Sequence, residues 1–245
     1  VDNAHKINEG KPIVLDNKSK DFFFLPRNST RDVSEEVAAL LTRKLPKYVG
    51  CKGTEIQVLT PMRNGDLGVS RLNAVLQNAL NPANSRKKEK ELASGIIFRE
   101  GDKVMQIRNN YDIVWKKCDG SAVGTGVFNG DVGIVKSIEP GLEQLTVVFD
   151  DREVDYDFDQ LGELEPAFTM TVHKSQGSEY RCVILSAWNG SAYLLNRSVL
   201  YTAVTRAREL LIVVGREETV GIMVQNAKVG RRYTGLKLRL QGKVK

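Results

Sequence analysis

The sequence predicts an α/β protein in which a parallel sheet with helices on both faces is interrupted by a small β-barrel. Short apolar runs alternate with amphipathic helical stretches over residues 21–82, and the same alternation resumes after Pro166. Such alternation is typical of a doubly wound parallel sheet. Between the two regions, residues 99–165 hold only short strand-like runs separated by turn signals, which favours an all-β insert.

The first region contains two predicted strands and two predicted helices. DFFFL (21–25) and EIQVLT (55–60) are short apolar runs that indicate buried strands. Residues 34–45 place four apolar side chains on one face and carry acids in the first turn, so we expect Ser34 to cap this helix and Pro46 to end it. Residues 68–82 repeat the helical spacing and end at Pro82.

The second region repeats the pattern. We expect strands at 182–187 (CVILSA) and 210–215 (LLIVVG) and a last helix at 217–227. The stretch 194–209 predicts a helix that turns Leu195, Val199 and Ala203 toward the sheet and carries Arg206 near its end.

The predicted insert consists of runs such as DKVMQIR (102–108), VGIVKSI (132–138), QLTVVF (144–149) and REVDYDF (152–158), with turn signals at Asn129-Gly130 and Pro140-Gly141. Asp150-Asp151 follows an apolar run, as does the acidic pair that holds magnesium in ATPases. Because no phosphate-binding loop precedes it and barrel-like strands surround it, we predict a turn between two strands there and no metal site.

Charge is unevenly distributed along the chain. Residues 99–165 contain 7 basic and 15 acidic residues, a net charge of −8, whereas the remainder contains 29 and 15, a net of +14, within the overall +6. A basic body suits a polyanion such as single-stranded nucleic acid, although a solvated surface would explain the charge equally well. We expect residues 84–91 (NSRKKEKE) to form a solvated hinge or loop, with DNA contact as the alternative. The acid-free tail 231–245 is expected to be a disordered arm or a further basic contact.

Two segments carry the most specific signal, TVHKSQGSEYRCVIL (171–185) and LYTAVTRARELLIVVG (200–215). Each joins a polar, glycine- or arginine-bearing stretch to a β-branched apolar run, as where a nucleotide-facing loop meets a buried parallel strand. Together they resemble the last two motifs of superfamily I DNA helicases. From Asn3 to about Gly215 the chain resembles the RecD-like branch, the exodeoxyribonuclease V alpha chain type. The resemblance implies a P-loop NTPase-like second RecA-like motor domain (1–98 and 166–230) with an inserted SH3-like barrel (99–165).

The resemblance also implies a nucleotide site. The arginine of Thr-Arg-Ala, Arg206, would be the finger that stabilises charge on the γ-phosphate. Gln176, Gly177 and Glu179 would lie on the nucleotide side, where the glycine permits close backbone approach and the two side chains can form hydrogen bonds. An ordinary ion pair is the alternative for Arg206 and is what we expect for Arg208.

The same resemblance implies a track for single-stranded DNA. The segment LTPMRNGDLGVSRLN (59–73) follows a strand and precedes a helix, where hydroxyl, backbone and guanidinium groups can bind phosphates; an ordinary connecting loop is the alternative. Phe128, Asn129 and Gly130 resemble a family element that we interpret as a turn and a domain-packing contact. The expected DNA contacts are Thr60, Pro61, Arg63, Asn73, Thr171, His173, Lys174, Ser175, and, in the insert, Arg108 and Asn109.

A stand-alone helicase needs a glycine-rich loop ending in Gly-Lys-Ser/Thr, and the only Gly-Lys pairs are Gly10-Lys11 and Gly242-Lys243, neither in that context. We therefore expect only the C-terminal half of a larger enzyme. The resemblance implies that this enzyme is an ATP-dependent 5′ to 3′ DNA helicase, an ATP hydrolase of recombination and repair. ATP with Mg²⁺ would be bound by the full-length parent and not tightly by this part.

The expected partners are single-stranded DNA and the N-terminal half of the same enzyme, with RecB- and RecC-like subunits left open. No apolar stretch approaches a membrane span, and we expect the bacterial cytoplasm. Two alternatives remain at this point: a nucleic-acid-binding module without catalysis, and a fragment of an Upf-like RNA helicase.

Overall fold

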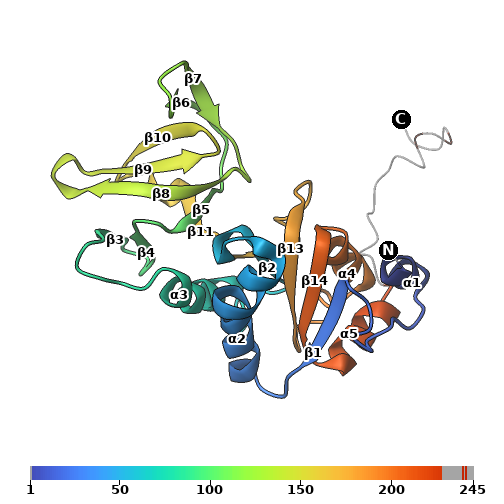
Figure 1. Ribbon diagram of the computed structural model, residues 1–245. Helices are drawn as coiled ribbons and strands as arrows, with labels where there is room; N and C mark the ends of the chain where they lie inside the picture. The colour runs from blue at the N-terminus through green and yellow to red at the C-terminus, as the bar shows by residue number, and fades with distance from the viewer. Residues whose placement is uncertain (1, 228–238, 240, 242–245) are drawn as a thin grey trace.

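The computed structural model describes residues 2–227, 239 and 241 and contains a five-stranded parallel sheet beside a seven-stranded antiparallel sheet (Figure 1). The parallel sheet has the order β1-β14-β13-β2-β12. Its strands are β1 (Phe22–Pro26), β14 (Ala207–Gly215), β13 (Tyr180–Ala187), β2 (Gln57–Thr60) and β12 (Thr169–Thr171). The alternation along the sequence is therefore realised as a doubly wound sheet, as predicted.

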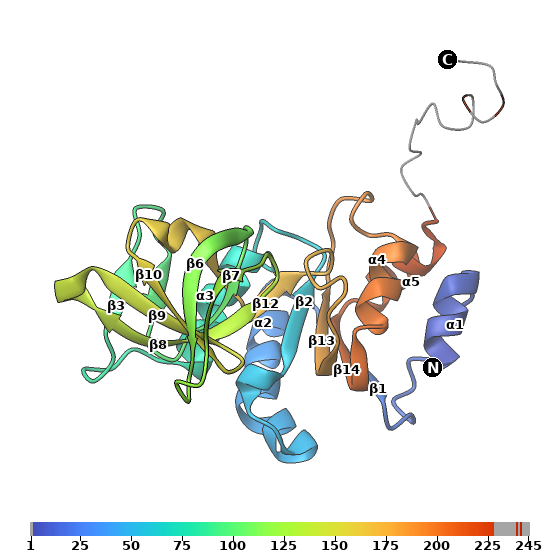
Figure 2. The same ribbon diagram turned by 90° about the horizontal axis from the view of Figure 1, so that it is seen from above.

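Helices cover both faces of this sheet. Figure 2 shows α2 (Thr30–Ala39) on one side, with α1 (Asp2–Glu9), α4 (Arg197–Val204) and α5 (Glu217–Gln225) on the other; α3 (Val69–Leu80) packs against α2. Neighbouring strand residues enter different cores: Val58 and Ile184 pack with α2 and α3, whereas Leu59 and Leu185 pack with α4 and α5. Successive side chains of these strands enter the cores on opposite faces of the sheet. Because both faces are buried, the strand sequences are continuous apolar runs.

The first long helix differs from the prediction at both ends. Ser29 is the N-cap and accepts a hydrogen bond from the backbone N–H of Asp32 at 3.0 Å, whereas Ser34 lies inside the helix and donates to the carbonyl of Arg31. Wider π-helical turns continue over Leu40–Lys44 and Pro46–Gly50, so Pro46 does not end the helical segment. Proline fixes φ at a helical value, so Pro46 can belong to a helical segment even though it has no N–H to donate.

The second predicted helix-to-strand boundary also shifts. Asn196 caps α4 by accepting from the backbone N–H of Val199 at 3.0 Å, and the helix ends at Val204. The strand β14 begins at Ala207, paired with Tyr180 of β13. Arg206 therefore lies in the turn between α4 and β14 and not on a helix that continues to residue 209.

The insert is an antiparallel sheet with the order β11-β5-β8-β9-β10-β6-β7. Its strands are β5 (Lys103–Gln106), β6 (Asn110–Lys117), β7 (Val123–Val127), β8 (Val132–Glu139), β9 (Gln144–Phe149), β10 (Arg152–Asp157) and β11 (Leu164–Pro166). A separate apolar core centred on Phe98, Phe149 and Tyr156 holds it together. Asp150 has φ +52° in the turn between β9 and β10, which confirms the turn predicted at Asp150-Asp151.

Residues 84–91 are only partly a loop. Glu89–Glu91 forms strand β3, which pairs with β4 (Ile97–Arg99) in a hairpin. The Arg99 guanidinium binds Glu89 across this hairpin, and Phe98 beside it is fully buried. The alternating charges of this stretch are thus cross-strand partners and exposed positions of a ribbon, which the charge run alone did not reveal.

A buried carboxylate attaches the insert to α3. Asp102 is fully buried and accepts hydrogen bonds from the side chains of Gln77 at 2.5 Å and Asn81 at 2.7 Å, and from the backbone N–H of Arg99 at 2.7 Å. Burial raises the pKa of Asp102 above its usual value, and these donors work against that shift. The two side-chain donors come from α3 and its C-cap, so they fix the start of β5 relative to the helix that packs on the parallel sheet.

The predicted tail at 231–245 lies outside the described residues apart from Arg239 and Gln241. Among the helices of the described part, none combines the length and the apolar composition needed to cross a bilayer.

Candidate nucleotide and nucleic-acid interface

The segment from Val172 to Glu179 connects opposite ends of the parallel sheet. Thr171, at the end of β12, is level with Thr60 at the end of β2, whereas Tyr180 at the start of β13 is level with Ala207 at the start of β14. The segment therefore begins beside the β2–α3 loop and ends beside the α4–β14 turn. The predicted DNA contacts lie at its first end and the predicted nucleotide contacts at its second end.

Arg206 reaches across to this segment. Its Nη1 donates to the backbone carbonyl of Ser178 at 2.9 Å, and its Nε donates to the carbonyl of Thr202 at 3.3 Å. The side chain is half-buried, and within the described part of the chain no acidic group forms an ion pair with it. The ordinary ion pair considered as the alternative for Arg206 is thus not what these residues form.

Arg208 behaves as expected of a surface residue. It lies on β14 and pairs with Glu179 at 2.7 Å, with both side chains more than half exposed. Gln176 and Gly177 are exposed in the turn beside this pair. Gly177 has φ +87°, and a Cβ at this position would meet no atom within 4 Å, so the backbone conformation is what requires glycine here.

At the other end of the segment, Arg63 and Lys174 meet at one carboxylate. Glu165 of β11 binds Arg63 at 2.7 Å and Lys174 at 2.8 Å. His173 is exposed beside Lys174. The structure therefore brings together three of the predicted DNA contacts and adds an acid that the sequence did not single out.

Four of the expected DNA contacts have buried side chains in this structure. The hydroxyls of Thr60 and Ser175 donate at 2.8 Å to the carbonyls of Leu67 and Val172, and Pro61 is buried beside them. The Asn73 amide donates to the carbonyls of Pro166 and Thr169 and accepts from the N–H of Thr169. The hydroxyl and amide donors of these side chains are all used by backbone carbonyls, so none is left for a phosphate of DNA. Thr171 is half-buried and accepts from the N–H of Lys174.

The two expected contacts of the insert are exposed. Arg108 and Asn109 lie between β5 and β6, where Asn109 accepts from the backbone N–H of Asn129 and donates to the Tyr111 hydroxyl. Tyr111 and Phe128 form an edge-to-face ring pair 5.7 Å apart and are 65% and 43% exposed. Phe128 begins a turn, as predicted, and the domain-packing contact stays a prediction.

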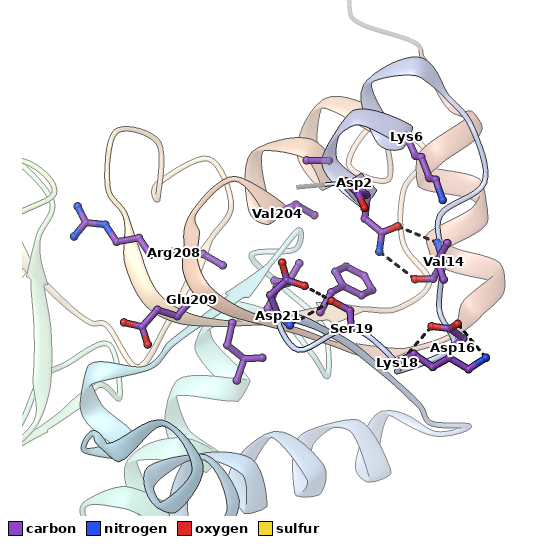
Figure 3. A pocket seen from close by; sticks show the side chains of 16 residues that line it. Asp2, Lys6, Val14, Asp16, Lys18, Ser19, Asp21, Val204, Arg208 and Glu209 are labelled. Carbon is purple, nitrogen blue, oxygen red and sulfur yellow. Dashed lines mark hydrogen bonds and ion pairs between the residues drawn. The ribbon is translucent and has the colours of Figure 1, made fainter.

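Two cavities lie near these groups. One of about 570 Å³ lies where α1, the segment before β1 and the start of β14 meet (Figure 3). Its lining carries charges of both signs and includes Arg208, but none of the predicted nucleotide or DNA contacts. The other, of about 450 Å³, lies between α3 and the β3–β4 turn and is lined by Arg63, Asn73 and Glu165 among others. Of these two cavities, the second adjoins predicted site residues and the first does not.

Two family models match the chain. The SH3 domain of ATP-dependent RecD-like DNA helicases matches residues 72–149, and the UvrD-like helicase C-terminal domain matches residues 166–214. The second match contains both segments that carry Gly177 and Arg206.

Curated relatives agree with these matches. The ATP-dependent RecD2 DNA helicase of Deinococcus radiodurans is 36% identical over 177 residues, which cover 72% of this chain and 22% of the relative. The RecBCD enzyme subunit RecD of Mycobacterium tuberculosis is 38% identical over 118 residues, 48% of this chain and 20% of the relative. The chain thus spans about a fifth of the length of these relatives.

The fold has a counterpart among solved structures. In a structure of two coordinating Pif1 helicases at forked double-stranded DNA, the similarity covers 99% of this chain and 52% of the other, with a TM-score of 0.50 and 15% identity. At this identity the likeness concerns the fold alone, and it agrees with a RecA-like parallel sheet that carries an SH3-like insert.

Proposed function

Because the chain belongs to the RecD-like helicase family, we propose that it forms the second RecA-like motor domain of an ATP-dependent DNA helicase. The domain would comprise residues 1–98 and 166–230, and residues 99–165 would be its SH3-like insert. A longer protein would supply the first motor domain, and ATP would bind between the two. The alternatives of a module without catalysis and an Upf-like RNA helicase are not favoured, because the RecD2 relative and the matched SH3 family model are named for DNA helicases.

The observation that carries the proposal is the state of Arg206. Its guanidinium is held by backbone carbonyls and by no acid of the described chain, next to the exposed turn of Gln176 and Gly177. A cation that is positioned but not neutralised suits an arginine finger, because its charge stays available for the γ-phosphate. Closure of the cleft between the motor domains would exchange the Ser178 carbonyl for a phosphate oxygen.

When bound, ATP with Mg²⁺ would supply the phosphoryl group and part of the neutralisation of its charge. The residues of this chain fit one side of that group: Arg206 for the γ-phosphate, and Gln176 with the Gly177 turn for the ribose or the attacking water. Glu179 would join them once its ion pair with Arg208 is released. The phosphate-binding loop and the magnesium ligands would belong to the first motor domain.

On the DNA side, Arg63, Lys174 and His173 would bind the backbone of a single strand, and Arg108 and Asn109 would add contacts from the insert. The net charge of +14 outside residues 99–165 supports binding through the body of the domain. By family relation we propose 5′ to 3′ movement in recombination and repair in the bacterial cytoplasm. The RecBCD relative makes RecB- and RecC-like subunits candidate partners.

Kinetics of the longer helicase test the proposal. Replacing Arg206 with alanine should lower DNA-stimulated ATP hydrolysis by about 10³- to 10⁵-fold while nucleotide binding is largely kept, since fingers act on the transition state. Arg208→Ala is the matched control, because it removes a neighbouring guanidinium that is already paired with Glu179. Turnover retained in Arg206→Ala would assign Arg206 a structural role and reject the finger.

A further inference from the structure

One carboxylate of the insert occupies a position between two predicted phosphate-binding cations. Glu165 contributes both oxygens: Oε1 binds Arg63 at 2.7 Å and Oε2 binds Lys174 at 2.8 Å. The three residues come from β11, the β2–α3 loop and the β12–β13 segment. The Glu165 side chain is 18% exposed, whereas those of Arg63 and Lys174 are 62% and 29% exposed. A carboxylate that bridges two cations with separate oxygens has the same charge sign and donor demand as a backbone phosphate.

The position of Glu165 is set by the fold and not by a freely moving loop. Glu165 pairs with Met105 in the antiparallel ladder of β11 and β5. The next residue, Pro166, is held by its carbonyl to the buried Asn73 amide of α3 at 2.8 Å. The backbone around the carboxylate is thus anchored on both sides, and only its side chain can leave the two cations without breaking a strand.

The carboxylate is charged under ordinary conditions. Burial raises the pKa of Glu165, but Lys174 and then Arg63 outweigh it, and the pKa lies below its usual value. The cluster of Arg63, Lys174 and Glu165 therefore carries one net positive charge instead of two. Single-stranded DNA that binds there gains less binding free energy from the two cations than it would if they were unpaired.

The surroundings leave room for an incoming strand. Arg63, Glu165 and Pro166 line the cavity of about 450 Å³ that extends between α3 and the β3–β4 turn. Its other walls include the apolar side chains of Val69 and Ile97. Open space beside both Arg63 and the carboxylate allows one anion to enter as the other withdraws.

We propose that Glu165 holds the place of a backbone phosphate, so that single-stranded DNA binds Arg63 and Lys174 by exchange with this carboxylate. The inference rests on the proposed function, since it concerns how the same DNA track is filled. Exchange replaces the ion pairs with Glu165 by ion pairs with a phosphate, so the net gain in binding free energy per phosphate is small. Glu165 thereby keeps the affinity of the domain for single-stranded DNA low, which suits a motor that releases the strand in every cycle.

The test is Glu165→Gln in the 245-residue chain, measured by fluorescence anisotropy with a labelled oligothymidylate over a range of salt concentrations. The amide keeps the size and can still accept one hydrogen bond, but it removes the competing charge. We expect binding to be about three- to tenfold tighter at low salt. The plot of log affinity against log salt should steepen by about 0.7, the value for one additional phosphate neutralised on a single strand.

The matched control is Glu36→Gln. Glu36 also bridges two cations, Arg27 and Lys44, each at 2.6 Å, and is 10% exposed, but it lies on α2 away from the track. Glu36→Gln removes the same charge, but it should change the affinity for the oligothymidylate much less than Glu165→Gln does. In addition, Lys174→Ala combined with Glu165→Gln should lose the gain, because the released cation is what the phosphate binds.

Equal gains for the two glutamine variants, or a gain that persists without Lys174, would overturn the inference. Equal binding and equal salt slope for the wild type and Glu165→Gln would reject it while leaving the proposed function intact. Absence of binding by both at low salt would reject the inference and the proposed DNA track together. Should the glutamine variant not fold, Glu165→Asp shortens the reach to both cations and should give a smaller gain, and no gain there would count against the inference.

Discussion

The guanidinium of Arg206 donates a hydrogen bond to the backbone carbonyl of Ser178 at 2.9 Å, and the carbonyl of Arg206 accepts one from the N–H of Tyr180 at 2.8 Å. The turn after α4 and the turn before β13 are thus joined twice. A displacement of the C-terminal end of the Val172–Glu179 segment would therefore act directly on Arg206. A neutral carbonyl also holds a guanidinium less tightly than a carboxylate would, so the side chain can be exchanged to a phosphate at modest cost.

This relationship predicts a small stability effect for Arg206→Ala in the 245-residue chain. The lost hydrogen bonds go to partly exposed carbonyls that water can satisfy, so the free energy of unfolding should fall by about 1–2 kcal/mol in urea titrations. Arg208→Ala, which breaks an exposed ion pair, should cost less than about 1 kcal/mol. A loss above about 4 kcal/mol for Arg206→Ala would instead show that the arginine holds the fold together.

Asn73 should be a stability residue. Asn73→Ala leaves the carbonyls of Pro166 and Thr169 and the N–H of Thr169 without their buried partner, and we expect a loss of about 2–4 kcal/mol in unfolding free energy. Ser70→Ala, at an exposed site on the same helix, should stay within about 0.5 kcal/mol of the wild type. Unchanged unfolding together with weakened DNA binding in Asn73→Ala would restore this residue to the DNA track.

The buried Lys103 should make stability depend on alkaline pH. Its ammonium donates to the carbonyl of Thr54 at 2.8 Å and to the Gln57 side chain at 3.0 Å, and it is 6% exposed. Burial lowers the pKa of Lys103 from 10.5 to about 8. Between these values the unfolded chain binds more protons than the folded one, so stability rises as the pH rises through this window. The cost of burying the charge is fully present below about pH 8.

Urea unfolding of the wild type and Lys103→Met at several pH values measures this effect. The difference in unfolding free energy between the two proteins should grow in favour of the wild type by up to roughly 3 kcal/mol from about pH 8 to pH 10.5. The methionine variant serves as the control for every other group that titrates there. Parallel pH profiles for the two proteins would contradict the prediction.

Sequence patterns located the elements better than their ends. The apolar runs around Val58, Ile184 and Ile212 predicted buried strands, and all three lie in the central sheet. The predicted start of the first long helix at Ser34 was wrong, because Ser29 accepts the hydrogen bond from a backbone N–H of the first turn while Ser34 donates to a carbonyl inside the helix. Arg206 lies outside the helix predicted for it, because Ala207 pairs with Tyr180 in the sheet and β14 therefore begins directly after Arg206.

The candidate site divides in the same way. Arg206, Gly177 and Lys174 could be singled out because the two segments that carry them resemble helicase motifs. The role of Glu165 could not, since its partner Arg63 is 102 positions earlier in the chain and they meet only when β11 returns from the insert. The exposed Tyr111–Phe128 pair likewise depends on strands that come together in the barrel.

By itself the sequence determined the alternation of strands and helices, the inserted β region and the two motif segments, because backbone propensity, turn chemistry and side-chain periodicity act over a few residues. The tertiary structure decided which polar side chains face inward, as Thr60, Asn73 and Ser175 do, and which charges meet, as Arg63, Lys174 and Glu165 do. Burial and ion pairing depend on what packs over a residue and on which loops the strand order places side by side, and neither is a local property of the chain.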